Sequence, residues 1–134
     1  MAKVAVVYWS GTGNTETMAN LVAQGATSKG AEVEIFSASD FNSGMVSNYD
    51  ALAFGCPSMG AEVLEECDFQ PMWDDVKETI GDKKVVLFGS YGWGDGEWMR
   101  NWAEEANPID TFICNDAPDD DAEESCKSLG EKLV

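Results

Sequence analysis

The chain of 134 residues carries 25 acidic side chains against eight basic ones and no histidine, which gives a formal net charge of −17. This charge excludes nucleic acid as a partner on electrostatic grounds, and the lack of histidine removes the commonest acid–base group near neutral pH. With 44% apolar residues, residues 1–134 are expected to form one domain with a core between two helix layers.

Cysteine spacing and hydropathy exclude several further classes of protein. The four cysteines have neither CxxC nor metal-site spacing; they are Cys56, Cys67, Cys114 and Cys126. No apolar run approaches the roughly 20 residues that a membrane-spanning helix needs. The first three residues lead directly into an apolar strand rather than a signal peptide. We therefore expect a cytoplasmic protein with reduced thiols, no metal site and no membrane contact.

Apolar runs alternate with helical patterns along the chain, which predicts a doubly wound α/β fold with a parallel sheet. Strands are expected over residues 3–8, 32–36, 51–56, 84–89 and 110–115, the last of them a short edge strand. Helices are expected over residues 14–29, 43–48, 71–79 and 97–105. A final helix is expected near the C-terminus, where Asp121 and Glu124 have the spacing of a capping box.

The segment from Trp9 to Glu16 follows the first strand and opens the first helix, with the sequence Trp-Ser-Gly-Thr-Gly-Asn-Thr-Glu. Small polar residues at such a junction aim hydroxyl and backbone N–H groups at one point, with the positive end of the helix dipole behind them. This arrangement is typical of a phosphate site, although an ordinary turn without a ligand is the alternative. Because the segment contains no Lys or Arg, a phosphate monoester on a tightly held cofactor is favoured. The candidate anchors are Ser10, Gly11, Thr12, Gly13, Asn14 and Thr15.

Two other phosphate loops do not match this segment. The Gly-Lys-Ser/Thr of a P-loop is missing around Met18, and Glu16 stands where a dinucleotide fingerprint has its third glycine. The segment instead resembles the phosphate loop of short-chain flavodoxins, especially those of anaerobic bacteria. Residues 55–62 (GCPSMGAE) and 88–96 (FGSYGWGDG) match that family in order and spacing. The resemblance implies a flavodoxin-like five-stranded parallel sheet of order 2-1-3-4-5 with helices on both faces.

The resemblance also implies non-covalently bound FMN, held by three loops at the carboxyl ends of strands one, three and four. Beyond the phosphate loop, the implied contacts are Pro57, Ser58, Met59, Gly60, Ala61, Glu62, Ser90, Tyr91, Gly92, Trp93, Gly94 and Asn115. Trp93 would cover the outer face of the flavin, with a hydrophobic staple as the alternative, and Met59 would lie against the inner face. Gly60 would turn its peptide to accept a hydrogen bond from flavin N5–H, and Glu62 would accept from N3–H.

Other residues near these loops have further expected roles. Trp9 is either an anchor of the phosphate loop or a ring contact. Cys56 is expected to pack as a small buried side chain, whereas Glu65 and its acidic neighbours are expected to disfavour an anionic reduced flavin. Residues 103–111 depart from the family, which has a longer helix end and a fuller fifth strand there.

By this resemblance, the protein is a low-potential one-electron carrier rather than an enzyme. Its FMN would cycle between semiquinone and hydroquinone while the protein shuttles between reductases and acceptor enzymes. An FMN-dependent quinone or nitro reductase is the alternative, but 134 residues leave no room for that class's extra loops. A phosphoacceptor receiver domain would need an Asp where Cys56 and Pro57 stand.

The stretch from Asp95 to the C-terminus is strongly acidic and includes three consecutive aspartates, Asp119, Asp120 and Asp121. One interpretation is a solvated face that only aids solubility. The other is a field that steers the protein toward redox partners with basic docking surfaces. The protein itself is expected to be a monomer.

Overall fold

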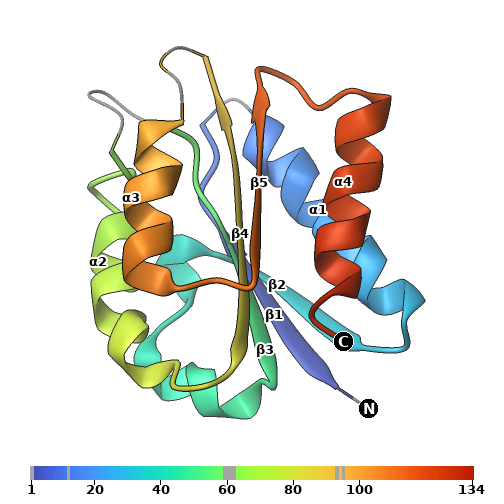
Figure 1. The fold of residues 1–134 in the computed structure, drawn as a ribbon. Helices are drawn as coiled ribbons and strands as arrows, with labels where there is room; N and C mark the ends of the chain where they lie inside the picture. Colours follow the sequence, from blue (N-terminus) through green and yellow to red (C-terminus); the bar gives the residue numbers. More distant parts are fainter. Residues whose placement is uncertain (1, 12, 59–62, 93, 95) are drawn as a thin grey trace.

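A five-stranded parallel sheet forms the middle layer of the computed structural model, which describes residues 2–11, 13–58, 63–92, 94 and 96–134 (Figure 1). The strands are β1 (Lys3–Tyr8), β2 (Glu32–Ser37), β3 (Ala51–Gly55), β4 (Lys84–Tyr91) and β5 (Asp110–Asn115). Their order is β2-β1-β3-β4-β5, and each neighbouring pair is parallel. Both the order and the direction of the strands are as predicted.

Helices cover both faces of the sheet (Figure 1). One face carries α1 (Asn14–Ser28) and α4 (Asp120–Glu131), and the other carries α2 (Phe69–Val76) and α3 (Glu97–Ala106). Three short 3-10 helices complete the connections: η1 (Ala38–Asp40), η2 (Ser43–Asn48) and η3 (Lys77–Thr79). Among the described residues, none of the helices is both long and apolar enough to cross a membrane.

The period-two alternation of the strands divides the core into two parts. In β1, Ala5 and Val7 pack on the side of α2 and α3, whereas Val4 and Val6 pack on the side of α1 and α4. Every residue of β3 is buried, because helices cover both of its faces. Continuous apolar runs rather than alternating ones are therefore the right pattern for the central strands.

Two glycines allow α1 and α4 to pack closely. A Cβ on Gly25 would lie 1.9 Å from the Lys127 carbonyl oxygen, and one on Gly130 would lie 1.9 Å from the Val22 carbonyl oxygen. Any side chain at either position would push the helices apart. The buried face of α1 includes Met18, Leu21, Val22 and Gly25, as the sequence pattern predicts.

Several element boundaries differ from the predictions, and three of these differences have a structural reason. β4 continues to Tyr91, two residues past its predicted end, because Ser90 and Tyr91 still pair with β5. α2 begins at Phe69 rather than at Pro71. The predicted capping box was wrong: Asp119, not Asp121, is the N-cap of α4, and its carboxylate accepts from the Ala122 N–H at 2.9 Å. Asp119 has the extended backbone that a cap needs, whereas Asp121 already lies inside the helix.

The strand order reverses between β1 and β3. After β1 the chain adds β2 at one edge of β1, and it later adds β3 at the opposite edge of β1. Loops that leave two such strands diverge and open a crevice at their carboxyl ends. In Figure 1 this end of the sheet is uppermost, and both chain termini lie at the lower end. The fold thus brings the loops after β1, β3, β4 and β5 to one end of the molecule.

Candidate functional site

The loop after β1 leaves several backbone donors free at the start of α1. Gly13 is the N-cap and has a left-handed backbone with φ 97°, which glycine adopts without strain. The first bond within the helix runs from the Thr17 N–H to the Gly13 carbonyl at 3.0 Å. The N–H groups of residues 14–16 precede that bond and have no acceptor within α1. They are available to an anion at the positive end of the helix.

Contacts within the same loop hold its shape. The Gly13 N–H donates to Ser10 Oγ at 3.0 Å, and the Trp9 N–H donates to the Gly55 carbonyl at 3.0 Å. The Trp9 ring packs over Gly11, where a Cβ would lie 3.1 Å from the ring. Trp9 therefore contacts the loop itself, and a larger residue at position 11 would displace its ring.

Within the described ranges, two buried hydroxyl groups near these loop ends lack hydrogen-bond partners. Thr15 is 1% exposed and Ser58 is 5% exposed, yet neither Thr15 Oγ1 nor Ser58 Oγ has a hydrogen-bond partner among the described residues. A third such atom, Trp102 Nε1, lies in the core on the side of α2 and α3. Because nearly all buried polar atoms in proteins are satisfied, the two hydroxyls fit a ligand that reaches both loops. Thr15 is the second residue of α1, so its hydroxyl lies beside the free N–H groups.

The loop after β3 is fixed at its base by Cys56. The Trp98 indole N–H donates to the Cys56 carbonyl at 3.1 Å, and the Glu65 N–H lies 3.4 Å from Cys56 Sγ. A Cβ on Gly89 would lie 2.2 Å from that same carbonyl oxygen, so only glycine fits there. Cys56 is fully buried, so it packs as a small buried side chain, as predicted, and this burial raises the pKa of its thiol to about 12.

Glu65 holds the end of the loop that follows β3, just before α2. The sequence reasoning missed this role. The side chain of Glu65 is 6% exposed, and its carboxylate accepts N–H bonds from Cys67 at 2.8 Å, Asp68 at 2.7 Å and Phe69 at 2.8 Å. Burial alone would raise the pKa of Glu65, but the three donors outweigh it and hold the pKa below its usual value. The bond from the Phe69 N–H also caps the first residue of α2, which explains the early start of this helix. The signal in the sequence is an acidic residue four positions before an apolar helix start at Phe69.

The ends of β4 and β5 are joined by hydrogen bonds at the same end of the sheet. The Tyr91 carbonyl accepts from the Asp116 N–H at 2.8 Å and from Asn115 Nδ2 at 3.2 Å. The Ser90 carbonyl accepts from the Ser58 N–H at 3.1 Å, which links the loops after β3 and β4. Asn115 is thus held against the end of β4.

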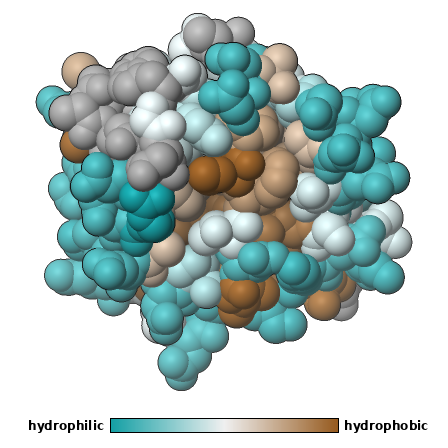
Figure 2. All heavy atoms as spheres, turned by 45° about the horizontal axis from the view of Figure 1, so that its top comes forward, coloured by the Kyte–Doolittle hydropathy of each residue, from teal (hydrophilic) through white to brown (hydrophobic). Residues whose placement is uncertain are grey.

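The structure therefore gathers the described candidate residues at one end of the sheet. They are Ser10, Gly11, Gly13, Asn14, Thr15, Pro57, Ser58, Ser90, Tyr91, Gly92, Gly94 and Asn115. The other candidates lie outside the described residues, so their roles stay predictions; these are Thr12, Met59, Gly60, Ala61, Glu62 and Trp93. Figure 2 brings this end toward the viewer and shows apolar side chains near the middle of the face within a largely hydrophilic surround.

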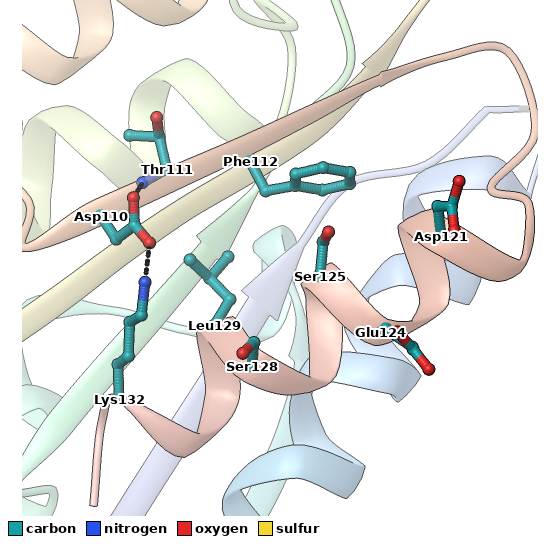
Figure 3. Close-up of a pocket in the computed structure, with 9 residues that line it drawn as sticks. All are labelled: Asp110, Thr111, Phe112, Asp121, Glu124, Ser125, Ser128, Leu129 and Lys132. Atoms are coloured by element: carbon teal, nitrogen blue, oxygen red, sulfur yellow. Dashed lines mark hydrogen bonds and ion pairs between the residues drawn. The ribbon is translucent and has the colours of Figure 1, made fainter.

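A separate groove of about 480 Å³ lies between β5 and α4, away from these loops (Figure 3). An ion pair between Asp110, at the start of β5, and Lys132, just beyond α4, closes one end of it. The hydrogen bond from Lys132 lowers the pKa of Asp110. The ion pair joins the start of β5 to the end of α4, so the groove lies where these two elements pack together. It brings none of the candidate residues together.

Comparisons with known proteins agree with this geometry. A family model described as Flavodoxin matches residues 6–107. A flavodoxin of Clostridium beijerinckii is 45% identical over 134 residues, covering 96% of this chain and 97% of that protein. A flavodoxin of Megasphaera elsdenii is 46% identical over 133 residues, covering 96% of each. The solution structure of two-electron reduced M. elsdenii flavodoxin superposes with a TM-score of 0.89 at 44% identity, covering 97% of both chains.

Proposed function

We infer that this chain, which belongs to the flavodoxin family and is therefore an FMN-binding electron carrier, holds the FMN phosphate at the start of α1. The observation that carries this proposal is the Thr15 hydroxyl, which is buried beside the free N–H groups of residues 14–16 and has no partner within the described part of the chain. Hydrogen bonds to a charged group contribute about 1.5–3 kcal/mol each. Several such bonds anchor a phosphate without help from a basic side chain.

The segments after β3 and β4 are proposed to hold the flavin ring. Met59 and Trp93 would contact its two faces, while Gly60, Glu62 and Asn115 would contact its polar edge and side chain. The bond between the Ser58 N–H and the Ser90 carbonyl supports this arrangement, because it holds the two segments side by side. When bound, FMN supplies the capacity to take up and release electrons singly. The formal net charge of −17 opposes further negative charge on the flavin, which favours a low potential.

The protein is proposed to act as a monomeric, cytoplasmic carrier and not as an enzyme. Flavodoxins work with redox partner proteins, and the start of α4 is a suitable place for basic partners to dock. Its first turn contains Asp120, Asp121 and Glu123, all of them exposed. This turn follows the loop after β5, at the same end of the sheet as the proposed flavin site. Opposite charges there would orient a basic partner toward the flavin.

Fluorescence titration of the apoprotein with FMN and with riboflavin tests the phosphate site. FMN should bind one to one and more tightly than riboflavin, and Thr15→Val should reduce FMN affinity at least about tenfold, the effect of one lost hydrogen bond to a charged group. Riboflavin affinity should not change, because riboflavin carries no phosphate. Thr27→Val, at an exposed position near the end of α1, is the matched control. Equal affinity of the unaltered protein for both flavins would refute the proposal.

A further inference from the structure

Glu16 occupies a position from which its side chain would be expected to compete for the phosphate site. It is the third residue of α1 after the N-cap Gly13. A Glu at this position commonly turns back to accept from the free N–H groups at the start of the helix. A carboxylate there is also stabilised by the helix dipole. Since residues 9–16 contain no basic side chain, an unrestrained Glu16 would be an anion inside the site that should receive a phosphate.

In the structure the Glu16 carboxylate lies elsewhere. Glu16 Oε2 accepts from the Tyr8 hydroxyl at 2.9 Å. The Gly13 N–H, which a capping Glu would normally take, donates to Ser10 Oγ at 3.0 Å instead. The donors at the start of α1 are therefore not used by the side chain of their own first turn.

Tyr8 is well placed to restrain Glu16. It is the last residue of β1, aligned with Ser37 of β2 and Gly55 of β3, and it packs against the core beneath α1 and α4. Burial and the neighbouring Glu16 carboxylate raise the pKa of Tyr8, so its hydroxyl stays protonated and able to donate at neutral pH. The bond from Tyr8 to Glu16 thus joins the two residues that flank the phosphate loop, one fixed in the sheet and one in the helix.

We propose that Tyr8 is a positioning residue for FMN, because its hydroxyl holds the Glu16 carboxylate away from the start of α1 and leaves those donors free for phosphate. This inference rests on the phosphate site proposed above. It assigns a role to two residues that do not themselves touch the phosphate with their side chains.

Titrating FMN and riboflavin into four apoproteins tests the inference: the unaltered chain, Tyr8→Phe, Glu16→Gln and the double variant. Tyr8→Phe releases the carboxylate, so FMN affinity should fall about two- to fivefold, the range expected for an anion at a helix start, while riboflavin affinity is unchanged. Glu16→Gln removes a negative charge near the phosphate and leaves nothing for Tyr8 to restrain, so FMN affinity should not fall. The double variant should bind FMN like Glu16→Gln, because Tyr8 then has no carboxylate to restrain.

Tyr49→Phe is the matched control, since the Tyr49 hydroxyl also interacts with a glutamate, Glu34, but lies beyond η2 and away from the loop. If Tyr8→Phe and Glu16→Gln both weaken FMN binding, and the double variant does no worse than either, the bond merely braces the loop and the inference fails. If Tyr8→Phe does not fold, Glu16→Gln alone tests the inference. A weaker preference of Glu16→Gln for FMN over riboflavin would then overturn the inference. An unaltered chain that does not prefer FMN over riboflavin would instead refute the phosphate site itself.

Discussion

Replacing Glu65 with Gln should destabilise the protein, although it only replaces one carboxylate oxygen by an NH₂ group. The carboxylate accepts three backbone N–H bonds: one oxygen binds Asp68 and Phe69, and the other binds Cys67. Gln keeps one acceptor oxygen, but its NH₂ group would face the Cys67 N–H, donor against donor. Hydrogen bonds to charged groups contribute about 1.5–3 kcal/mol each, and the two remaining bonds lose their charge. We therefore expect the free energy of unfolding to fall by about 2–4 kcal/mol.

Urea denaturation of the apoprotein at pH 7, followed by tryptophan fluorescence, measures this loss. Glu66→Gln is the matched control, because Glu66 is the next residue and its side chain is exposed. That substitution should change the free energy of unfolding by no more than about 0.5 kcal/mol. A loss below that value in Glu65→Gln would mean that the three bonds at the base of this loop contribute little.

The pH dependence gives a second check on Glu65. The pKa of Glu65 is lower in the folded protein than in the unfolded chain, where the pKa of a glutamate is about 4.3. The stabilisation is thus complete above that value and is lost as the pH falls through the folded pKa. The difference in unfolding free energy between the unaltered protein and Glu65→Gln should shrink as the pH falls from 6 to 3. A difference that stays constant over this range would refute the assignment of a charged, hydrogen-bonded carboxylate.

Three further predictions address other parts of the structure. Ser58→Ala should weaken FMN and riboflavin binding equally, because Ser58 lies on the proposed ring segment; a loss confined to FMN in fluorescence titration would contradict this placement. Gly25→Ala should lower the free energy of unfolding by about 1–3 kcal/mol in urea denaturation, because its Cβ meets the Lys127 carbonyl, whereas Gly44→Ala meets only Asn42 Oδ1 at 3.2 Å and should cost little. Electron transfer to a basic acceptor, followed by stopped-flow absorbance, should slow as salt rises, since exposed charges are screened beyond roughly 8–10 Å at moderate ionic strength. A rate indifferent to salt would leave the acidic surface as a solubility feature.

The features predictable from the sequence are those that repeat locally. The apolar runs in β1 and β3 and the helix face containing Met18 and Val22 follow directly from periodicity. The proposed phosphate loop could be picked out because its small polar residues are contiguous and stand between a strand and a helix. The five-strand order followed from the family resemblance rather than from periodicity.

The features that were missed depend on contacts that the local pattern does not encode. Glu65 reads as one more surface carboxylate until the fold buries it against the backbone of Cys67, Asp68 and Phe69. The cap of α4 was placed two residues too late, because three consecutive aspartates offer equivalent side chains and only the backbone of Asp119 is extended. The bond between Tyr8 and Glu16 requires the phase of α1 relative to β1, which the residue pattern alone leaves open.

Stepwise anaerobic reduction of the FMN-loaded protein, followed by absorbance and electron paramagnetic resonance, tests the central claim most directly. A one-electron carrier should accumulate the one-electron-reduced flavin during the titration, with the second electron entering at a clearly lower potential. Reduction in a single two-electron step without a radical, together with oxidation of NADH or NADPH when a quinone or nitro compound is supplied, would contradict the carrier function and favour a reductase.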